Sequence, residues 1–236
     1  MRRRRRHGAP SVLGEMAIAL GTYAAALGVR RVVWSPAGRS RARRNTERLI
    51  RLERRLGIAV EPALQRAAMP RVPLGALNAV YVGANIGFTV GSLAVLLRRR
   101  DPGYRPLRRG VAGTMLAAQV PFLLFPTAPP RTTDGFVDTM SEASGVDLDK
   151  GGVSQLFNPI AAMPSLHMAW AVISAESLRA CSRRPEVRAA AALYPPAVAT
   201  VVLVTANHLV VDVVAGSLLG WAGLRAGRRY PPQSSG

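Results

Sequence analysis

Three histidines are present in the whole chain, and two of them lie at the boundaries of apolar segments. His208 precedes a long apolar segment, and Asp212 follows it four residues later. On a helix this spacing places both side chains on one face, within hydrogen-bonding reach. A carboxylate beside an imidazole fixes the tautomer and raises the basicity of the far nitrogen. His208 is therefore a candidate nucleophile or base, and Asp212 is the group that would orient it.

The second histidine, His167, lies near the start of another apolar segment, just after Pro164 and Ser165. Backbone amides in the first turn of a helix favour an anion such as phosphate, which makes Ser165 a candidate phosphate-binding residue. His167 in the same turn has the chemistry to protonate a leaving oxygen. Arginine is the usual clamp for a phosphate, and Arg131 lies in the segment before this helix.

Each of these features also has a purely structural explanation. His208 and Asp212 would serve equally as a buried polar pair that joins helices, and His167 as an interfacial histidine bonded to a carbonyl. A metal site is a third reading, but no fourth ligand and no recognised metal-binding spacing accompanies these residues, so no metal is predicted. A catalytic site is favoured because two of the three histidines and an acid within an apolar helix meet on one side.

The elements that must position these residues are apolar, although the chain is strongly basic. Its 236 residues are 49% hydrophobic, yet they carry a formal net charge of +19. Long uncharged apolar runs exclude a soluble nucleic-acid binder, and the high apolar content excludes a disordered chain. The single cysteine, Cys181, excludes a disulfide scaffold. A membrane protein with basic ends and loops remains.

Six apolar segments approach or exceed the length of a membrane-spanning helix, which predicts an all-α protein with six transmembrane helices. They cover residues 13–29, 72–97, 110–127, 159–178, 189–206 and 209–224. A single membrane domain is therefore expected over 13–229, between a basic tail at 1–12 and a disordered tail at 230–236. The first segment is expected to be a retained helix, because no small-residue cleavage site follows it. The pair Pro195-Pro196 should kink the fifth helix or confine its regular part to later residues.

Arginine clusters predict the orientation in the cell membrane. If six helices alternate, the basic clusters fall on one side, which is then cytoplasmic together with both termini. These clusters are residues 2–6, 98–109, 179–188 and 225–229. The loop 128–158 and both candidate histidines fall on the opposite, external face.

Residues 30–71 also fall on the external side by alternation, although they contain twelve arginines. Within them, residues 45–66 have apolar side chains at helical spacing, which predicts an amphipathic helix lying on the membrane surface. Asn45 or Thr46 would cap its start. Anchoring to anionic lipid headgroups is the favoured role of the arginines, and gathering of an anionic substrate is the alternative.

Two stretches resemble known motifs: Pro164-Ser165-Leu166-His167 and His208-Leu209-Val210-Val211-Asp212. They are similar to the second and third signatures of the type 2 phosphatidic acid phosphatase superfamily. Over about residues 45–225, the closer likeness is to bacterial members of its inositol-phosphorylceramide synthase-like and sphingomyelin synthase-like branch. The stretches that carry it are residues 52–57, 125–131, 135–138, 158–167 and 206–216.

The resemblance implies six membrane helices and a mechanism without metal or cofactor. His208 would attack phosphorus and form a phosphohistidine, Asp212 would orient His208, and His167 would protonate the leaving alcohol. Water or a second alcohol would then accept the phosphoryl group or the phosphorylated headgroup. The expected partners are a membrane lipid substrate and an anionic lipid surface, with no nucleic acid, and the oligomeric state is left open.

The sequence departs from the phosphatase members in one respect. They carry a Lys-and-Arg first signature and a Ser-Arg pair before the third-signature histidine, whereas residues 201–207 contain no arginine. Arg131 would replace this phosphate clamp, and Lys150 is a weaker candidate. The departure fits the synthase-like branch, so headgroup phosphotransfer is expected. Hydrolysis of a lipid phosphate or prenyl diphosphate is the alternative, and a transporter or scaffold with a structural His–Asp pair is the non-enzymatic one.

Overall fold

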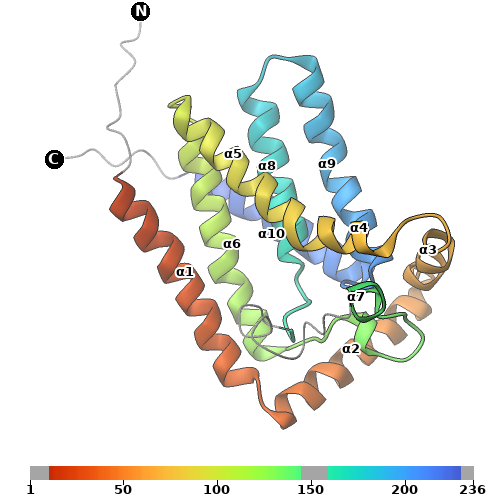
Figure 1. Cartoon of the computed structure of the whole chain (residues 1–236). Coiled ribbons are helices and arrows are strands. Elements are labelled where there is room, and N and C mark those ends of the chain that lie inside the picture. The colour runs from red at the N-terminus through yellow and green to blue at the C-terminus, as the bar shows by residue number, and fades with distance from the viewer. Residues whose placement is uncertain (1–10, 145–158, 230–236) are drawn as a thin grey trace, which may run out of the picture.

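The chain folds into a bundle of helices in the computed structural model, which describes residues 11–144 and 159–229 (Figure 1). No strand occurs in these two ranges, so the predicted all-α class is confirmed there. The elements are α1 (Val12–Val33), α2 (Pro36–Leu56), α3 (Glu61–Ala68), α4 (Leu74–Ala79), the π-helical turn η1 (Val80–Ala84), α5 (Asn85–Arg98), α6 (Tyr104–Leu124), the 3-10 turn η2 (Pro130–Thr132), α7 (Thr139–Ser144), α8 (Leu166–Cys181), α9 (Pro185–Val204) and α10 (Val210–Arg229). The predicted disordered tail at 230–236 lies outside the described residues.

All six predicted apolar segments contain a long helix, and in the described ranges four helical runs are long and apolar enough to cross a membrane. These are Val12–Val33, Leu74–Arg98, Pro185–Val204 and Val210–Arg229. The helices of the other two segments, α6 and α8, do not meet this criterion of length and hydropathy. The first turns of α6 contain arginines, and α8 has only 16 residues. The chain is a membrane protein with several such helices, whereas the count of six spans stays a prediction.

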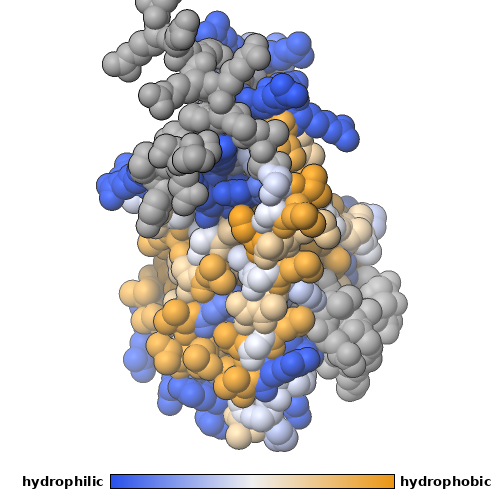
Figure 2. Space-filling view, turned by 90° about the vertical axis from the view of Figure 1, so that its left-hand side faces the viewer, coloured by the Kyte–Doolittle hydropathy of each residue, from blue (hydrophilic) through white to orange (hydrophobic). Residues whose placement is uncertain are grey.

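The bundle is held together by close packing of α10 between α6 and α8. Leu107 of α6, Ile173 of α8 and Leu224 of α10 form a buried core where these three helices meet. α9 packs on the other side of α8, and α1 packs chiefly against α6. Large exposed apolar side chains remain on the outside of α1, α5, α6, α9 and α10. On the face that Figure 2 displays, apolar side chains form a band between two hydrophilic ends, the pattern that a lipid bilayer requires.

The arginine-rich segment forms two helices across one end of this bundle, so the single helix predicted at 45–66 is wrong in its extent (Figure 1). α2 begins at Pro36, where the Ser35 side chain accepts a hydrogen bond from Gly38 N, and it ends at Gly57, whose φ is +68°. That left-handed conformation favours glycine and stops the helix before α3 begins. The predicted caps, Asn45 and Thr46, instead lie buried within α2.

The proline pair in the fifth apolar segment does not interrupt its helix. α9 runs without a break from Pro185 to Val204 and includes Pro195 and Pro196. The expectation that these prolines confine the regular helix to later residues is therefore wrong. Each proline removes one backbone hydrogen-bond donor. The remaining backbone hydrogen bonds and the packing against α8 keep α9 helical at these positions.

Candidate active site

His208 lies in the bend between α9 and α10, two residues before α10 begins. It is 4% exposed, and its Nδ1 lies 3.6 Å from Oδ2 of Asp212, which is 1% exposed. The predicted pair is thus brought together, although His208 is outside the helix that carries Asp212. At this distance the two groups make no hydrogen bond, and both ring nitrogens of His208 are buried without a hydrogen-bond partner among the described residues.

Three buried carboxyl groups hold the start of α10 in place behind His208. Oδ2 of Asp212 accepts from Leu209 N at 2.9 Å, Glu61 Oε1 accepts from Val210 N at 2.7 Å, and Glu53 Oε1 accepts from Val211 N at 2.7 Å. The first amides of a helix have no partner inside the helix and carry the positive end of its dipole. The acids of α2, α3 and α10 therefore satisfy these amides and fix the bend that carries His208.

Burial changes the acidity of one of these carboxyls. The pKa of Glu53 is raised from 4.5 to about 8, chiefly because its surroundings exclude water, while the hydrogen bond from Val211 N opposes the shift. The neighbouring carboxyls of Glu61 and Asp212 raise the pKa further. Like charges this close do not ionise together readily, so the folded protein holds a proton on this cluster.

His167 occupies the first turn of α8, as predicted, and faces His208 with a ring-centroid separation of 5.7 Å. Its ring stacks on Tyr81 at 4.4 Å, and its Nε2 lies 3.2 Å from the Tyr81 carbonyl oxygen. Asn85 donates from Nδ2 to the His167 carbonyl at 3.0 Å and accepts at Oδ1 from the Tyr194 hydroxyl at 2.9 Å. Side chains of η1, α5 and α9 thus fix the histidine of α8.

Arg131 is buried at 5% exposure and joins the loops that meet above the two histidines. Its Nε donates to Asn207 Oδ1, next to His208, and its Nη1 donates to Asp138 Oδ2, each at 3.0 Å. The candidate phosphate clamp therefore lies at the site, where it also positions the residue before His208.

The two remaining candidate phosphate-binding residues are placed differently. Ser165 is fully buried and caps α8, because its hydroxyl accepts from Met168 N at 3.3 Å and its own amide donates to the Asp212 carbonyl at 3.1 Å. Lys150 lies outside the described residues. In the part of the chain that the structure covers, no group of three or more His, Cys, Asp and Glu side chains is arranged to hold a metal ion.

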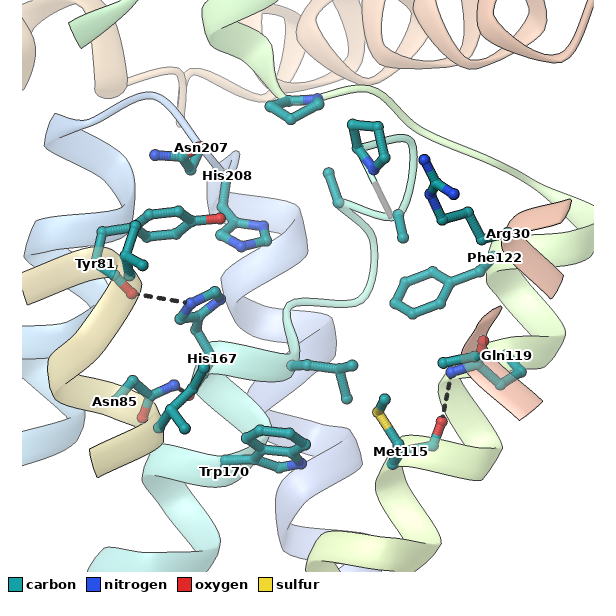
Figure 3. Close-up of a pocket in the computed structure, with 18 of the residues that line it drawn as sticks. Arg30, Tyr81, Asn85, Met115, Gln119, Phe122, His167, Trp170, Asn207 and His208 are labelled. Carbon is teal, nitrogen blue, oxygen red and sulfur yellow. Dashed lines mark hydrogen bonds between the residues drawn. The ribbon is translucent and has the colours of Figure 1, made fainter. Parts of the chain in front are cut away.

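A cavity of about 370 Å³ opens beside the two histidines (Figure 3). Figure 3 shows Tyr81, Asn85, His167 and His208 on one wall, and Arg30, Gln119 and Phe122 on the opposite wall. Residues from α1, η1, α5, α6, α8 and the loops at 129–131, 159–162 and 207–208 line it. Most of the lining is apolar, and its polar side chains lie on both walls, beside the histidines and at Arg30 and Gln119 opposite them, as in sites that take an amphipathic ligand.

Sequence reasoning missed several residues of this site. Tyr81 and Trp170 lie in apolar runs where an aromatic residue usually signals only packing. Glu53 is flanked by Arg51, Arg54 and Arg55, and Glu61 belongs to the same arginine-rich segment, which suggested solvated charges. The one available signal was that Glu53 lies on the same helix face as Leu49 and Ile50, which proved to be the buried face of α2.

Comparison with known proteins gives one match. A family model described as the PAP2 superfamily matches residues 47–226, which is more than half of the chain and includes both histidines and Asp212. No curated protein and no solved structure matches the chain significantly. The matched segment begins within α2, so α1 lies outside it.

Proposed function

Because the chain belongs to the PAP2 superfamily, whose members are phosphatases and phosphotransferases, we propose that it is a membrane enzyme that transfers a phosphorylated lipid headgroup through a phosphohistidine at His208. One observation carries the proposal: His208 and His167 face each other at one wall of a largely apolar cavity, and Asp212 lies beside the Nδ1 of His208. Such a cavity suits a lipid whose acyl part lies among apolar side chains while its phosphate reaches the histidines.

In the first half of the proposed reaction, Nε2 of His208 attacks phosphorus. Asp212 lies on the Nδ1 side, so it favours the tautomer that leaves Nε2 with a lone pair. The 3.6 Å separation closes to a hydrogen bond as positive charge develops on the imidazole, because catalytic hydrogen bonds often tighten only in the reacting complex. The ester P–O bond breaks, and His167, which the bound anionic phosphate keeps protonated, delivers its proton to the leaving alcohol.

In the second half, the P–N bond of the phosphohistidine breaks. An acceptor alcohol, or water, attacks phosphorus while neutral His167 takes the proton of the attacking oxygen, which restores both histidines. The contact between His167 Nε2 and the Tyr81 carbonyl keeps the ring beside His208 for both proton transfers. The nature of the acceptor decides whether the net reaction is transfer or hydrolysis.

Transfer is the favoured outcome, and it agrees with the sequence of the loop before His208. Residues 201–207 lack the arginine of the hydrolytic members, which fits the inositol-phosphorylceramide synthase-like and sphingomyelin synthase-like branch. Arg131 supplies a cation at this position from another loop. No metal ion takes part in the proposed mechanism, because histidine is both nucleophile and acid. We place the reaction at the external face of the cell membrane, with both termini cytoplasmic.

The experiment uses the purified full chain with phosphatidic acid, a prenyl diphosphate and phosphatidylinositol, each with and without a diacylglycerol acceptor whose acyl chains differ in length from those of the donor, and identifies the products by mass spectrometry. His208→Ala should lower turnover by roughly 10⁴-fold, and Asp212→Asn by about 10²-fold or more, because each removes part of one nucleophilic unit. Glu176→Gln is the matched control, since it changes an acid at the far end of α8.

The products distinguish a transferase from a phosphatase. A headgroup found on the added acceptor indicates a transferase, and released inorganic phosphate indicates a phosphatase. Rapid denaturation during turnover should leave an acid-labile phosphoryl group on the wild-type protein and none on His208→Ala. Equal turnover by wild type and His208→Ala would contradict the proposal and would leave the His–Asp pair with a structural role only.

A further inference from the structure

The wall of the cavity opposite the histidines carries two polar atoms that the proposed mechanism does not use. The first is Nε of Arg30, which is buried and has no hydrogen-bond partner in the described ranges. Arg30 belongs to the last turn of α1 and lines the cavity. Its guanidinium lies 5.6 Å from the centre of the Trp34 ring, which limits its freedom to turn away.

The second atom is Oε1 of Gln119, which is also buried and unpartnered within the described ranges. The Gln119 side chain is 8% exposed, and its Nε2 donates to the Met115 carbonyl at 2.7 Å, which assigns the amide so that Oε1 remains as an acceptor. Figure 3 shows Gln119 and Arg30 on the same wall, one from α6 and one from α1. A buried donor and a buried acceptor are costly unless a ligand or an ordered water satisfies each of them.

The chemistry of this pair differs from that of the other arginine at the cavity. Arg131 bonds Asn207 and Asp138, whereas Arg30 forms no ion pair with an acid among the described residues. A terminal phosphate satisfies both orphaned atoms: its oxyanions accept from the guanidinium, and its remaining P–OH, which titrates near pH 6, donates to an amide oxygen.

We propose that Arg30 and Gln119 bind a second phosphate of the lipid substrate, distinct from the phosphorus that His208 attacks. The preferred substrates are then lipids with two linked or neighbouring phosphates. Arg30 lies on α1, outside the segment that matches the family, whereas Gln119 lies within that segment. The inference rests on the proposed function for the identity of the reacting phosphate.

The test compares two substrates that differ by one phosphate, farnesyl diphosphate and farnesyl monophosphate, and reports the ratio of their kcat/KM values. Arg30→Gln should lower this ratio about ten-fold or more, since a charged hydrogen bond is lost with only one of the substrates. Arg31→Gln is the matched control: it removes the same charge from the next residue, which is exposed, and should leave the ratio within about two-fold of wild type. Gln119→Leu should lower the ratio less than Arg30→Gln, because only a neutral partner is lost.

An unchanged ratio in Arg30→Gln, or the same fall in Arg31→Gln, would overturn the inference. An equal fall for both substrates would overturn it too, because Arg30 would then act on the reacting phosphate or on the fold. The hydroxyl groups of a lipid headgroup could also satisfy Arg30 and Gln119. Turnover of phosphatidylinositol and of phosphatidic acid by Arg30→Gln distinguishes this case, because a loss of turnover on phosphatidylinositol alone would contradict binding of a second phosphate.

Binding separates this inference from the proposed function. Titration of tryptophan fluorescence with methylenediphosphonate and with methylphosphonate needs no turnover, and Trp170 lines the cavity as a reporter. If no lipid phosphate is turned over but the diphosphonate binds tighter in an Arg30-dependent manner, only the proposed function fails. If turnover is normal and diphosphonate binding does not depend on Arg30, only the inference fails.

Discussion

At the scale of single residues, the position of His167 depends on a side chain that need not touch the substrate phosphate. Asn85 is 2% exposed and bridges the His167 carbonyl on one side and the Tyr194 hydroxyl on the other. It therefore ties α5 to α8 and α9 directly beneath the reacting groups. A shift of about 1 Å in a proton-transfer group is enough to cost a large factor in rate.

Asn85→Leu should consequently lower kcat by about ten-fold or more while KM changes little, because the residue positions the acid and does not bind the lipid phosphate. Tyr194→Phe is the control, since it removes one of the two hydrogen bonds and keeps the aromatic stack on Phe88. Its kcat should stay within about three-fold of wild type. Steady-state kinetics on vesicles measures both, and a large rise in KM with unchanged kcat in Asn85→Leu would contradict the positioning role.

The residues of the site were predictable from the sequence where their chemistry is rare and were missed where it is common. Two of three histidines and one acid in an apolar helix stood out by type alone. Ser165 was placed correctly at the start of α8, but whether its hydroxyl meets a ligand or the helix depends on side-chain direction, which spacing does not specify. Tyr81 and Trp170 belong to apolar runs in which only the folded backbone shows which side chains face the cavity.

At the scale of elements, the arginine-rich helices α2 and α3 act on the site through two acids. Glu53 and Glu61 are fully buried and accept hydrogen bonds from consecutive amides of α10. The arginines of α2 lie on its other faces. The segment thus has an inner face that fixes the bend at His208, and an outer face that remains available for the predicted contact with anionic lipids.

This arrangement predicts a pH dependence of stability. The pKa of Glu53 is raised from 4.5 to about 8, so the folded protein keeps a proton that the unfolded chain loses above about pH 4.5. The unfolded state is therefore favoured progressively as the pH rises from about 5 to 8, and the melting temperature should fall across that window. Glu53→Gln mimics the protonated form and keeps the acceptor for Val211 N, so its melting temperature should fall less and should exceed that of wild type at pH 8.

Thermal unfolding in detergent at several pH values measures this difference, and each kcal/mol should appear as a shift of about 2–4 °C in a chain of this size. Glu47→Gln provides the matched control, because Glu47 lies on the same helix but is solvent-accessible and paired with Arg43. Parallel melting profiles for wild type and Glu53→Gln would show that the proton is not held on this residue.

The existence of the elements followed from apolar periodicity, whereas their boundaries depended on contacts between distant residues. The predicted start of an interfacial helix at Asn45 failed because that side chain bonds the Pro126 carbonyl inside the fold instead of capping a helix. The bend at His208 was taken as the start of a helix because spacing alone does not reveal that acids from α2 and α3 cap α10 two residues later.

At the scale of the whole molecule, the histidines meet because α10 approaches α8 very closely. A Cβ atom at Gly220 would lie 2.5 Å from the Ala169 carbonyl oxygen, and one at Gly216 would lie 2.2 Å from the Ser165 carbonyl oxygen. Gly220→Ala should therefore separate the two helices, cost about 1–3 kcal/mol of stability and lower activity. Gly113→Ala on α6 has no atom within 4 Å of the new Cβ, so it should be neutral or slightly stabilising. Melting temperature and turnover of the two variants, measured side by side, test this, and equal behaviour would contradict close packing as the constraint.

The distribution of charge gives the last prediction, which concerns the orientation of the whole bundle. The end of α5, the start of α6 and the α8–α9 joint gather at the end of the bundle opposite to α2 and α3 (Figure 1). These segments are rich in arginine and short, so they should remain in the cytoplasm, and the histidines should face outward.

Labelling of introduced cysteines in a Cys181→Ser background tests this orientation. Asp134→Cys lies in the loop that contacts α2, and Arg183→Cys lies in the α8–α9 joint, both at exposed positions. A membrane-impermeant maleimide added to intact cells should label the Asp134→Cys variant, and it should label the Arg183→Cys variant only after the cells are opened. The reverse pattern would place the active site in the cytoplasm and would show that the arginines of α2 dominate the orientation.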